Sequence, residues 1–317
     1  MSSSRRILMY VFWLKDHVVR LLSNVAVQIL GMDIAGTVVA VGAKVTTYKA
    51  GDRVAAIAPG AITGNQAGAG FQLYTIVPEG FAARIPDNLP FTNAVVLPLA
   101  LATAASGLFE LQYLGIDVPT VTPSTTMVNQ NKAILVWGGS SSVGSCAIQL
   151  CTATGLTVFA TASSKNFEYV KNLGASHVFD YKDPDVVTKL VQATHGKTIV
   201  GVYDSISSNA TILACAQFLQ AFGGGKVYGT VSDAGALELP EGVKRVSGSP
   251  PHSAVDGGPA VWHRVWADFM RKGLENGRLR AKPEPIVLEG GLQRLQEGID
   301  MCREGVSAQK VVIELVK

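Results

Sequence analysis

The stretch from Ala133 to Lys165 constrains the fold of this chain more than any other part, and it reads AILVWGGSSSVGSCAIQLCTATGLTVFATASSK. An apolar run, Ala133–Trp137, meets a run of small residues, Gly138–Gly144. A helical pattern follows, and a second apolar run, Leu156–Thr161, ends shortly before two serines and a lysine. This order predicts a strand, a phosphate-binding loop, a helix and a second strand, which form the first unit of a dinucleotide-binding fold.

The small residues of the loop suit a pyrophosphate. Backbone N–H groups and the positive end of a helix dipole hold phosphate oxygens, and a Cβ would block their approach. The spacing departs from G-x-G-x-x-G, because Ser141 takes the middle glycine position of a G-x-x-G-x-x-G pattern, and an ordinary strand-to-helix turn remains an alternative. The cofactor-binding residues predicted in the loop are Gly138, Gly139, Ser140, Ser141, Ser142, Val143 and Gly144.

The end of the second strand favours one nucleotide over the other. An NAD site usually places Asp or Glu about 20 residues after the loop, where it holds the ribose 2′-hydroxyl. Here Ser163, Ser164 and Lys165 stand in that place. Two hydroxyls and an ammonium suit a 2′-phosphate and leave no carboxylate to repel it, so NADPH is the predicted cofactor. The alternative is that Lys165 is an ordinary solvated surface lysine.

The bulk composition limits the classes of function. The 317 residues suffice for two domains, and 48% apolar against 16% charged residues predicts a well-buried core. A net charge of +3 without a long basic run gives no argument for nucleic acid. The four cysteines are scattered, which predicts no disulfide framework or zinc cluster and fits a reducing, cytoplasmic setting. No segment is long enough for a membrane span, and Ile7–Leu14 is predicted as a buried strand or helix.

The patterns along the chain change at Ala133. Residues 31–86 look β-rich, and from Ala133 to about Val231 strands and helices alternate, which predicts a parallel sheet with helices on both faces. Within this alternation the later strands are predicted at Val178–Asp180, Val200–Tyr203 and Lys226–Thr230. Elsewhere the patterns predict strands at Ile34–Val41, Phe71–Pro78 and Val311–Leu315 and helices at Ala94–Leu111 and Val261–Gly277.

Several local motifs accompany this order of elements. They are Leu30-Gly31-Met32-Asp33-Ile34-Ala35-Gly36, Val41-Gly42, Gly51-Asp52-Arg53-Val54, Leu97-Pro98-Leu99-Ala100, the phosphate loop, Leu173-Gly174-Ala175 and Asp180-Tyr181. Together they resemble the medium-chain dehydrogenase/reductase superfamily, and within it the chain looks most like fungal zinc-binding-dehydrogenase-type proteins, whose relatives include quinone oxidoreductases and trans-acting enoyl reductases of polyketide synthesis.

The resemblance implies an α/β fold in which a GroES-like β-rich domain accompanies a Rossmann doubly wound parallel sheet. The implied division is 1–104 for the first part of the substrate domain, 105–259 for the nucleotide domain and 260–317 for a return segment.

The resemblance also implies roles for single residues. Tyr181 matches a tyrosine that flanks the 2′-phosphate, and Thr103 matches a threonine near the nicotinamide, where it is the candidate catalytic residue. Asp204-Ser205 and Gly229 would follow neighbouring strands close to the nicotinamide. Thr103 could instead bond its own helix backbone, and Tyr181 could be a half-buried turn residue.

Two features depart from the family. Zinc-dependent members carry a histidine before the acid of a G-H-E segment, whereas Met32 precedes Asp33 here, and no cysteine occupies the region of the structural lobe. We therefore predict no bound metal. Members usually have some fifty residues before the L-G-x-D-x-A-G segment, and Met1–Gln28 does not resemble that stretch, so we expect a shortened substrate domain.

The resemblance therefore implies an NADPH-dependent, zinc-independent reductase of an activated C=C bond or a quinone in fungal secondary metabolism. One alternative is a catalytically impaired NADPH-binding scaffold or regulatory partner of a biosynthetic enzyme, and another is an alcohol dehydrogenase. The expected partners are a small-molecule or carrier-bound substrate, without nucleic acid or membrane, and the protein would be a monomer or a homodimer in the cytoplasm.

Overall fold

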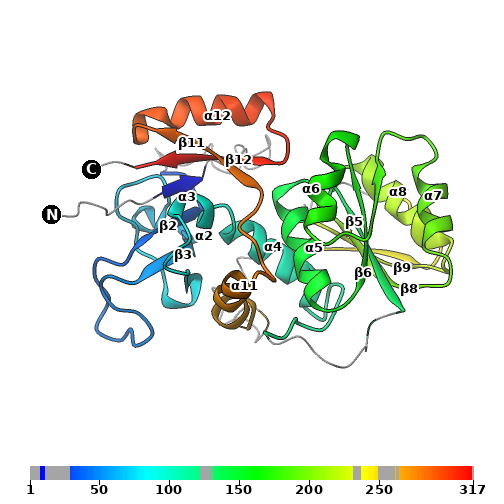
Figure 1. The fold of residues 1–317 in the computed structure, drawn as a ribbon, viewed down its shortest axis with the longest axis horizontal. Helices are drawn as coiled ribbons and strands as arrows, with labels where there is room; N and C mark the ends of the chain where they lie inside the picture. Colours follow the sequence, from blue (N-terminus) through cyan, green and yellow to red (C-terminus); the bar gives the residue numbers. More distant parts are fainter. Residues whose placement is uncertain are drawn as a thin grey trace. The chain divides into compact units, whose positions relative to one another are not determined.

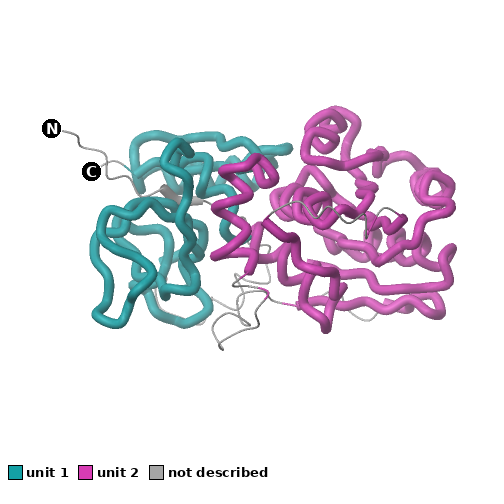
Figure 2. The backbone as a smooth tube through the Cα atoms, turned by 60° about the horizontal axis from the view of Figure 1, so that its bottom comes forward, with its two compact units in different colours: residues 1–99, 281–317 teal, residues 100–280 magenta. Residues whose placement is uncertain are grey.

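The computed structural model describes residues 8–10, 29–121, 129, 131–230, 237–248, 261 and 264–315 of the chain. The chain splits into two compact units, which Figure 2 shows in two colours. Unit 1 comprises Met1–Leu99 with Ala281–Lys317, and unit 2 comprises Ala100–Arg280. The division at 104/105 and 259/260 that the sequence suggests stays a prediction about domains.

Unit 1 is built on a six-stranded sheet in the order β11-β12-β1-β2-β3-β4. Strands β11 and β12 are parallel, and every other neighbouring pair is antiparallel. The expectation of a strand or helix in Ile7–Leu14 is met by a strand over its described residues. The strands are β1 (Leu8–Tyr10), β2 (Asp33–Thr37), β3 (Arg53–Ile57), β4 (Ala82–Arg84), β11 (Glu284–Glu289) and β12 (Gln309–Glu314).

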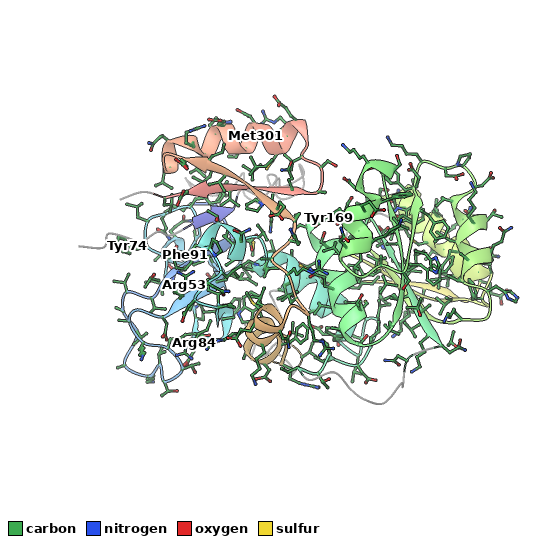
Figure 3. The ribbon with its side chains drawn as sticks, in the orientation of Figure 1. Arg53, Tyr74, Arg84, Phe91, Tyr169 and Met301 are labelled. Carbon is green, nitrogen blue, oxygen red and sulfur yellow. The ribbon has the colours of Figure 1, made fainter. Side chains whose placement is uncertain are left out.

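Short helices pack against the strands of this sheet. Helix α12 (Leu295–Glu304) packs its apolar side chains on the buried side chains of β11 and β12. Helix α3 (Phe91–Ala94) places Phe91 under the guanidinium of Arg53, whose carbon lies 4.1 Å from the ring centroid (Figure 3). The remaining short helices of unit 1 are α2 (Gly60–Thr63) and the 3₁₀ turns Gln66–Gly68, Glu79–Phe81 and Leu292–Arg294.

The strand predicted at Phe71–Pro78 is wrong, because this segment forms bends and extended chain without a sheet partner. Side chains of this segment donate hydrogen bonds to nearby backbone carbonyls, and its backbone forms no ladder with another strand. Gln72 donates to the carbonyl of Ala69 at 2.8 Å, and the Thr75 hydroxyl donates to the same oxygen at 2.8 Å. Alternating apolar residues favour a strand only where a neighbouring strand can take up the N–H and C=O groups.

Unit 2 contains a six-stranded sheet in the order β10-β9-β8-β5-β6-β7, and all of its pairs are parallel. The first of these strands in the sequence, β5, lies inside the sheet between β8 and β6. The later strands are added outward on each side of it, which is the doubly wound arrangement. The prediction of a Rossmann sheet is therefore confirmed. The strands are β5 (Lys132–Trp137), β6 (Thr157–Ala162), β7 (His177–Asp180), β8 (Thr198–Asp204), β9 (Gly225–Gly229) and β10 (Val243–Ser247).

Helices cover both faces of this sheet. Helices α5 (Ser142–Ala153) and α6 (Phe167–Asn172) lie on one face, and α7 (Val186–Ala193) and α8 (Asn209–Gln220) lie on the other (Figure 1). Side chains of α7 and α8 form one buried cluster with side chains of the sheet. The segment predicted as one helix at Val261–Gly277 is a π-helical stretch, Arg264–Phe269, followed by α11 (Met270–Asn276).

The expectation that no segment could span a membrane needs a correction. Helix α4 (Pro98–Phe109) and the turns before it make a helical stretch, Phe91–Phe109, that has the length and composition of a membrane span. However, 78% of this stretch is buried inside the folded chain, as expected for a core helix. Burial against protein explains its apolar composition, so it gives no argument for a membrane.

Candidate dinucleotide-binding site

The loop after β5 brings the backbone of the chain unusually close to itself. Gly138 has a φ of 78°, a conformation that favours glycine. Its N–H donates to the Thr161 hydroxyl at 3.1 Å, and the N–H of Gly139 donates to the Thr161 carbonyl at 2.8 Å. A Cβ added at Gly144 would stand 2.3 Å from the carbonyl oxygen of Gly138. The predicted requirement for small residues at this loop therefore has a direct steric cause.

The start of helix α5 has the features of an anion site. Ser141 is its N-cap, and its hydroxyl accepts the Gly144 N–H at 3.0 Å. The first N–H groups of a helix have no carbonyl one turn earlier, so those of Ser142 and Val143, which the Ser141 cap does not use, are available to an acceptor. The Ser142 hydroxyl oxygen is buried and has no hydrogen-bond partner in the part of the chain that the structure describes. A phosphate group fits these residues.

Two side chains that the sequence did not single out hold the loop from outside. Tyr169 of α6 (Figure 3) and Ser145 of α5 place their hydroxyl oxygens 2.8 Å apart. The Ser145 hydroxyl lies 3.3 Å from the carbonyl oxygen of Gly139. Since Ser145 donates to that carbonyl, the Tyr169 hydroxyl donates to Ser145. This chain of bonds fixes the loop, and no local pattern in the sequence signals it.

The ends of β6 and β7 bring the predicted 2′-phosphate residues together. Ala162 pairs with Asp180 in the sheet, so Ser163 and Tyr181 leave neighbouring strands at the same edge. Ser163 begins a 3₁₀ turn that contains exposed Ser164 and Lys165. Tyr181 is 46% exposed, which leaves its ring accessible to a ligand. The grouping agrees with the prediction, and the binding roles of these residues stay predictions.

The end of β8 is organised by a buried carboxylate. Asp204 is 0% exposed, and its carboxylate accepts the N–H of Ile206 at 2.9 Å and the Thr211 hydroxyl at 2.6 Å. Burial raises the pKa of the Asp204 carboxyl, and these hydrogen bonds oppose the shift. In this structure, Asp204 shapes the turn that follows its strand. Gly229 ends the neighbouring strand β9, where it is paired with Asp204.

Ser205 links that turn to the phosphate loop. Its hydroxyl accepts from the Ser141 hydroxyl at 2.9 Å. It also lies 2.7 Å and 2.9 Å from the carbonyl oxygens of Trp137 and Gly138. The predicted cofactor residues Ser141 and Ser205 are thus in direct contact, although 64 positions separate them.

Thr103, the candidate catalytic residue, lies in the middle of α4 and is 8% exposed. Its backbone carbonyl accepts the Tyr203 hydroxyl at 2.9 Å. Because Tyr203 belongs to β8, the helix is tied to the sheet beside the strand that ends at Asp204. Its proposed contact with the nicotinamide stays a prediction.

Asp33, which follows Met32 at the position compared with the zinc-dependent members, belongs to a buried ion pair. Asp33 and Lys310 are 1% and 2% exposed in unit 1, and the Lys310 ammonium lies 3.1 Å from the Asp33 carboxylate. Asp33 also accepts the Leu99 N–H at 2.5 Å. The described residues contain no group of three or more His, Cys, Asp or Glu arranged to hold a metal ion.

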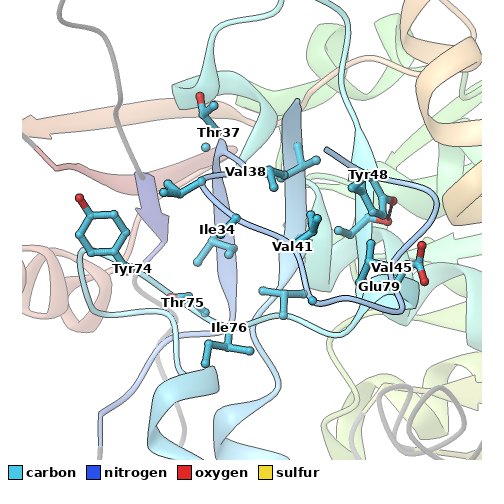
Figure 4. Close-up of a pocket in the computed structure, with 18 of the residues that line it drawn as sticks. Ile34, Thr37, Val38, Val41, Val45, Tyr48, Tyr74, Thr75, Ile76 and Glu79 are labelled. Atoms are coloured by element: carbon cyan, nitrogen blue, oxygen red, sulfur yellow. Dashed lines mark hydrogen bonds between the residues drawn. The ribbon is translucent and has the colours of Figure 1, made fainter. Parts of the chain in front are cut away.

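Unit 1 also contains a separate hollow of about 420 Å³, shown in Figure 4. Its walls are mostly apolar, and they come from β2, β3 and the segments that follow β2 and precede β4. Two of its polar groups are already used, because the Tyr48 hydroxyl donates to the Ala82 carbonyl and the Glu79 carboxylate accepts the Thr47 N–H at 2.8 Å, and no lysine, arginine or histidine lines it. This hollow offers nothing to hold a phosphate.

Two known protein families match separate parts of the chain, one in each unit. Residues 14–87 match the alcohol dehydrogenase GroES-like domain, and residues 142–245 match the zinc-binding dehydrogenase family. The predicted GroES-like part is thereby confirmed. The first match begins at residue 14, so the resemblance extends further toward the N-terminus than the motifs alone indicate.

Curated relatives cover most of this chain. It is 44% identical to the trans-enoyl reductase himH of Aspergillus japonicus, over 90% of this chain and 81% of that protein. It is 37% identical to the dehydrogenase orsE of Emericella nidulans, over 90% of this chain and 83% of that protein.

Solved structures share the fold. An alcohol dehydrogenase superfamily protein from Novosphingobium aromaticivorans has a TM-score of 0.76 at 23% identity, covering 99% of this chain and 92% of that one. The CurK enoyl reductase has a TM-score of 0.73 at 20% identity, covering 96% and 84%. At these identities the likeness concerns the fold alone.

Proposed function

Because this chain belongs to the medium-chain dehydrogenase/reductase superfamily, with relatives that include fungal trans-enoyl reductases, we propose that it is an enoyl-reductase-type oxidoreductase that uses NADPH. The observation that carries the proposal is the loop at Gly138–Gly144. There the Gly144 backbone lies close to the Gly138 carbonyl, Ser141 caps the start of α5, and the buried Ser142 hydroxyl has no hydrogen-bond partner among the described residues. The proposed substrates are an enone, a quinone or an enoyl thioester, either free or bound to a carrier.

The preference for NADPH rests on the ends of β6 and β7. Ser163, Ser164 and Lys165 would face the 2′-phosphate, and Tyr181 would flank it. Hydroxyl and ammonium groups bond a phosphate dianion strongly, and an ammonium adds charge attraction. In this proposal the choice of cofactor depends on side chains of the turns that follow β6 and β7, at one edge of the sheet.

In the proposed reaction the protein orients the reactants. When bound, NADPH supplies the hydride, and the proton that completes the reduction would come from water or a hydroxyl group. The loop N–H groups and Ser142 would hold the pyrophosphate, and Ser205 would keep the loop in place through Ser141. Thr103 would present its hydroxyl beside the nicotinamide as a hydrogen-bond donor to the substrate carbonyl.

The proposed reduction needs no metal. The donor set at the family's zinc position is Met32 and Asp33, and the Asp33 carboxylate already bonds Lys310. Polarisation of the substrate carbonyl by hydrogen bonds can replace a Lewis acid in reduction of an activated C=C bond. Alcohol oxidation is the weaker variant, since it requires a zinc ion or a general base to remove the hydroxyl proton.

The purified chain tests the proposal directly. It is titrated with NADPH and NADH, and loss of reduced-nicotinamide absorbance is followed with a panel of enones, quinones and enoyl thioesters. We expect tighter binding of NADPH and turnover of at least one acceptor class. Binding without turnover on every acceptor would favour an NADPH-binding scaffold that docks on a biosynthetic enzyme, and lack of affinity for both nucleotides would exclude both functions.

The Lys165→Ala variant tests the cofactor preference. We expect NADPH to bind about tenfold more weakly, because a charge-assisted contact to the 2′-phosphate is lost, and NADH to bind almost unchanged. Equilibrium titration of both nucleotides measures the effect. An equal loss for NADPH and NADH would contradict the role of Lys165 and leave the fold assignment intact.

We also expect a cytoplasmic protein that acts as a monomer or homodimer without nucleic acid. These expectations follow from the composition and from the family, and fractionation and sedimentation of the native protein would test them.

A further inference from the structure

We propose that Lys182 is a second cation for the 2′-phosphate of NADPH and that it shares this ligand with Lys165. The inference rests on the proposed function, because it concerns the same nucleotide site. It adds a residue that the sequence motifs did not assign, and it predicts that specificity for the phosphorylated cofactor is divided between two strand ends.

The first observation is the sheet register. Ala162, the last residue of β6, pairs with Asp180, the last residue of β7. Neighbouring parallel strands lie about 4.8 Å apart, so the chain segments that follow these two residues start side by side. Lys165 comes three positions after Ala162, and Lys182 comes two positions after Asp180. Both side chains are exposed at this edge.

The second observation is the distribution of charge. Two of the nearby acids are already engaged, because Glu168 pairs with Lys171 at 3.1 Å and Asp183 pairs with Lys189. In contrast, neither Lys165 nor Lys182 forms an ion pair with any residue that the structure describes. Two ammonium groups at one sheet edge are therefore available to an anion, which is the charge that a phosphate dianion requires.

Asp180 ends β7 at this edge, and its bonding explains why it does not block the site. Asp180 accepts the backbone N–H of Lys182 at 2.9 Å and so closes the turn after β7. This bond sets the direction in which residue 182 leaves the strand. The single negative charge of Asp180 is exceeded by the two positive charges of Lys165 and Lys182.

The position of the ammonium adds a third observation. The Lys182 nitrogen lies 6.0 Å from the centroid of the Tyr181 ring, over its face. A cation at this distance is weakly attracted by the ring, which keeps the ammonium beside the tyrosine that would flank the phosphate. In this structure the Lys182 ammonium therefore lies beside the residue that would flank the phosphate.

Titration of four proteins tests the inference: the unchanged chain, Lys182→Ala, Lys182→Arg and the control Lys171→Ala. The control removes the same charge from a lysine of α6 that is paired with Glu168 and half exposed. The probes are NADPH, NADH and adenosine 2′,5′-bisphosphate, and the readout is the dissociation constant.

We expect Lys182→Ala to raise the dissociation constants of NADPH and adenosine 2′,5′-bisphosphate about tenfold and to leave that of NADH almost unchanged. Arginine at 182 should retain most of the affinity for both phosphorylated probes, and Lys171→Ala should behave as the unchanged chain does. These three results together would establish a contact between Lys182 and the 2′-phosphate.

The inference is overturned if Lys182→Ala keeps the NADPH affinity, or if Lys171→Ala loses as much, since the effect would then be one of general charge. In either case tight NADPH binding by the unchanged chain would leave the proposed function standing. Failure of the unchanged chain to bind NADPH would instead reject the proposed function itself and this inference with it.

Discussion

The Gly144→Ala variant is expected to lose measurable binding of both NADPH and NADH. The new Cβ would stand 2.3 Å from the carbonyl oxygen of Gly138, and backbone atoms cannot yield as the end of a flexible side chain can. The loop must therefore move away from α5, which separates the N–H groups from the position of the pyrophosphate. Because the pyrophosphate is common to both nucleotides, the loss should not depend on the 2′-phosphate.

Equilibrium titration with each nucleotide measures this effect, and circular dichroism reports whether the variant is folded. The matched control is Gly80→Ala, because a Cβ at Gly80 meets no atom within 4 Å and its φ is ordinary for an L-residue. If Gly144→Ala does not fold, Ser142→Ala tests the same site without a clash. It should weaken both nucleotides equally, and unchanged affinity in a folded variant would refute the role of the loop.

The phosphate loop could be predicted because its determinants are local. The apolar strand, the small residues and the helix follow one another in the chain, and each has a physical requirement that a short window contains. The predicted strand Ala133–Trp137 differs from β5 only by the addition of Lys132. The core helix within Ala94–Leu111 was recognised for the same reason, and it begins at Pro98, a residue suited to a first helical turn.

The bonds that hold the loop could not be predicted, because they join distant residues. Ser141 contacts Ser205 across 64 positions, and Tyr169 reaches Ser145 across 24 positions. A hydroxyl at an exposed turn and a hydroxyl in such a bond look the same in the sequence. Edge strands such as β10 were missed for a related reason, since their partial burial leaves a weak pattern of alternation.

The buried ion pair of unit 1 is the second feature with a large expected effect. Replacing Asp33 by alanine should lower the free energy of unfolding by about 3–5 kcal/mol, because it removes the carboxylate that pairs with the buried Lys310 ammonium. The Leu99 N–H at the start of α4 would lose its acceptor in the same variant. Denaturant unfolding followed by circular dichroism measures the change.

An exposed ion pair gives the comparison. Arg271 and Glu275 lie 2.8 Å apart on α11, with about half of each side chain exposed. Arg271→Ala should change the free energy of unfolding by less than about 1 kcal/mol, because water screens such a pair. Equal effects of Asp33→Ala and Arg271→Ala would contradict the view that burial makes the first pair important.

The pH dependence of the stability of the Lys310→Met variant should reveal the titration of Asp33. Burial raises the pKa of the Asp33 carboxyl, and the attraction of Lys310 opposes that shift. Without Lys310 the folded-state pKa of Asp33 should rise further, so the folded chain would bind a proton that the unfolded chain has released. The variant should therefore be most stable below the ordinary pKa of an aspartate and lose stability as the pH rises through the raised value. The free energy of unfolding of the variant and of the unchanged chain is compared between about pH 4 and pH 8, a range that brackets this rise. A difference that stays constant over this range would show that Asp33 does not become an isolated buried carboxylate.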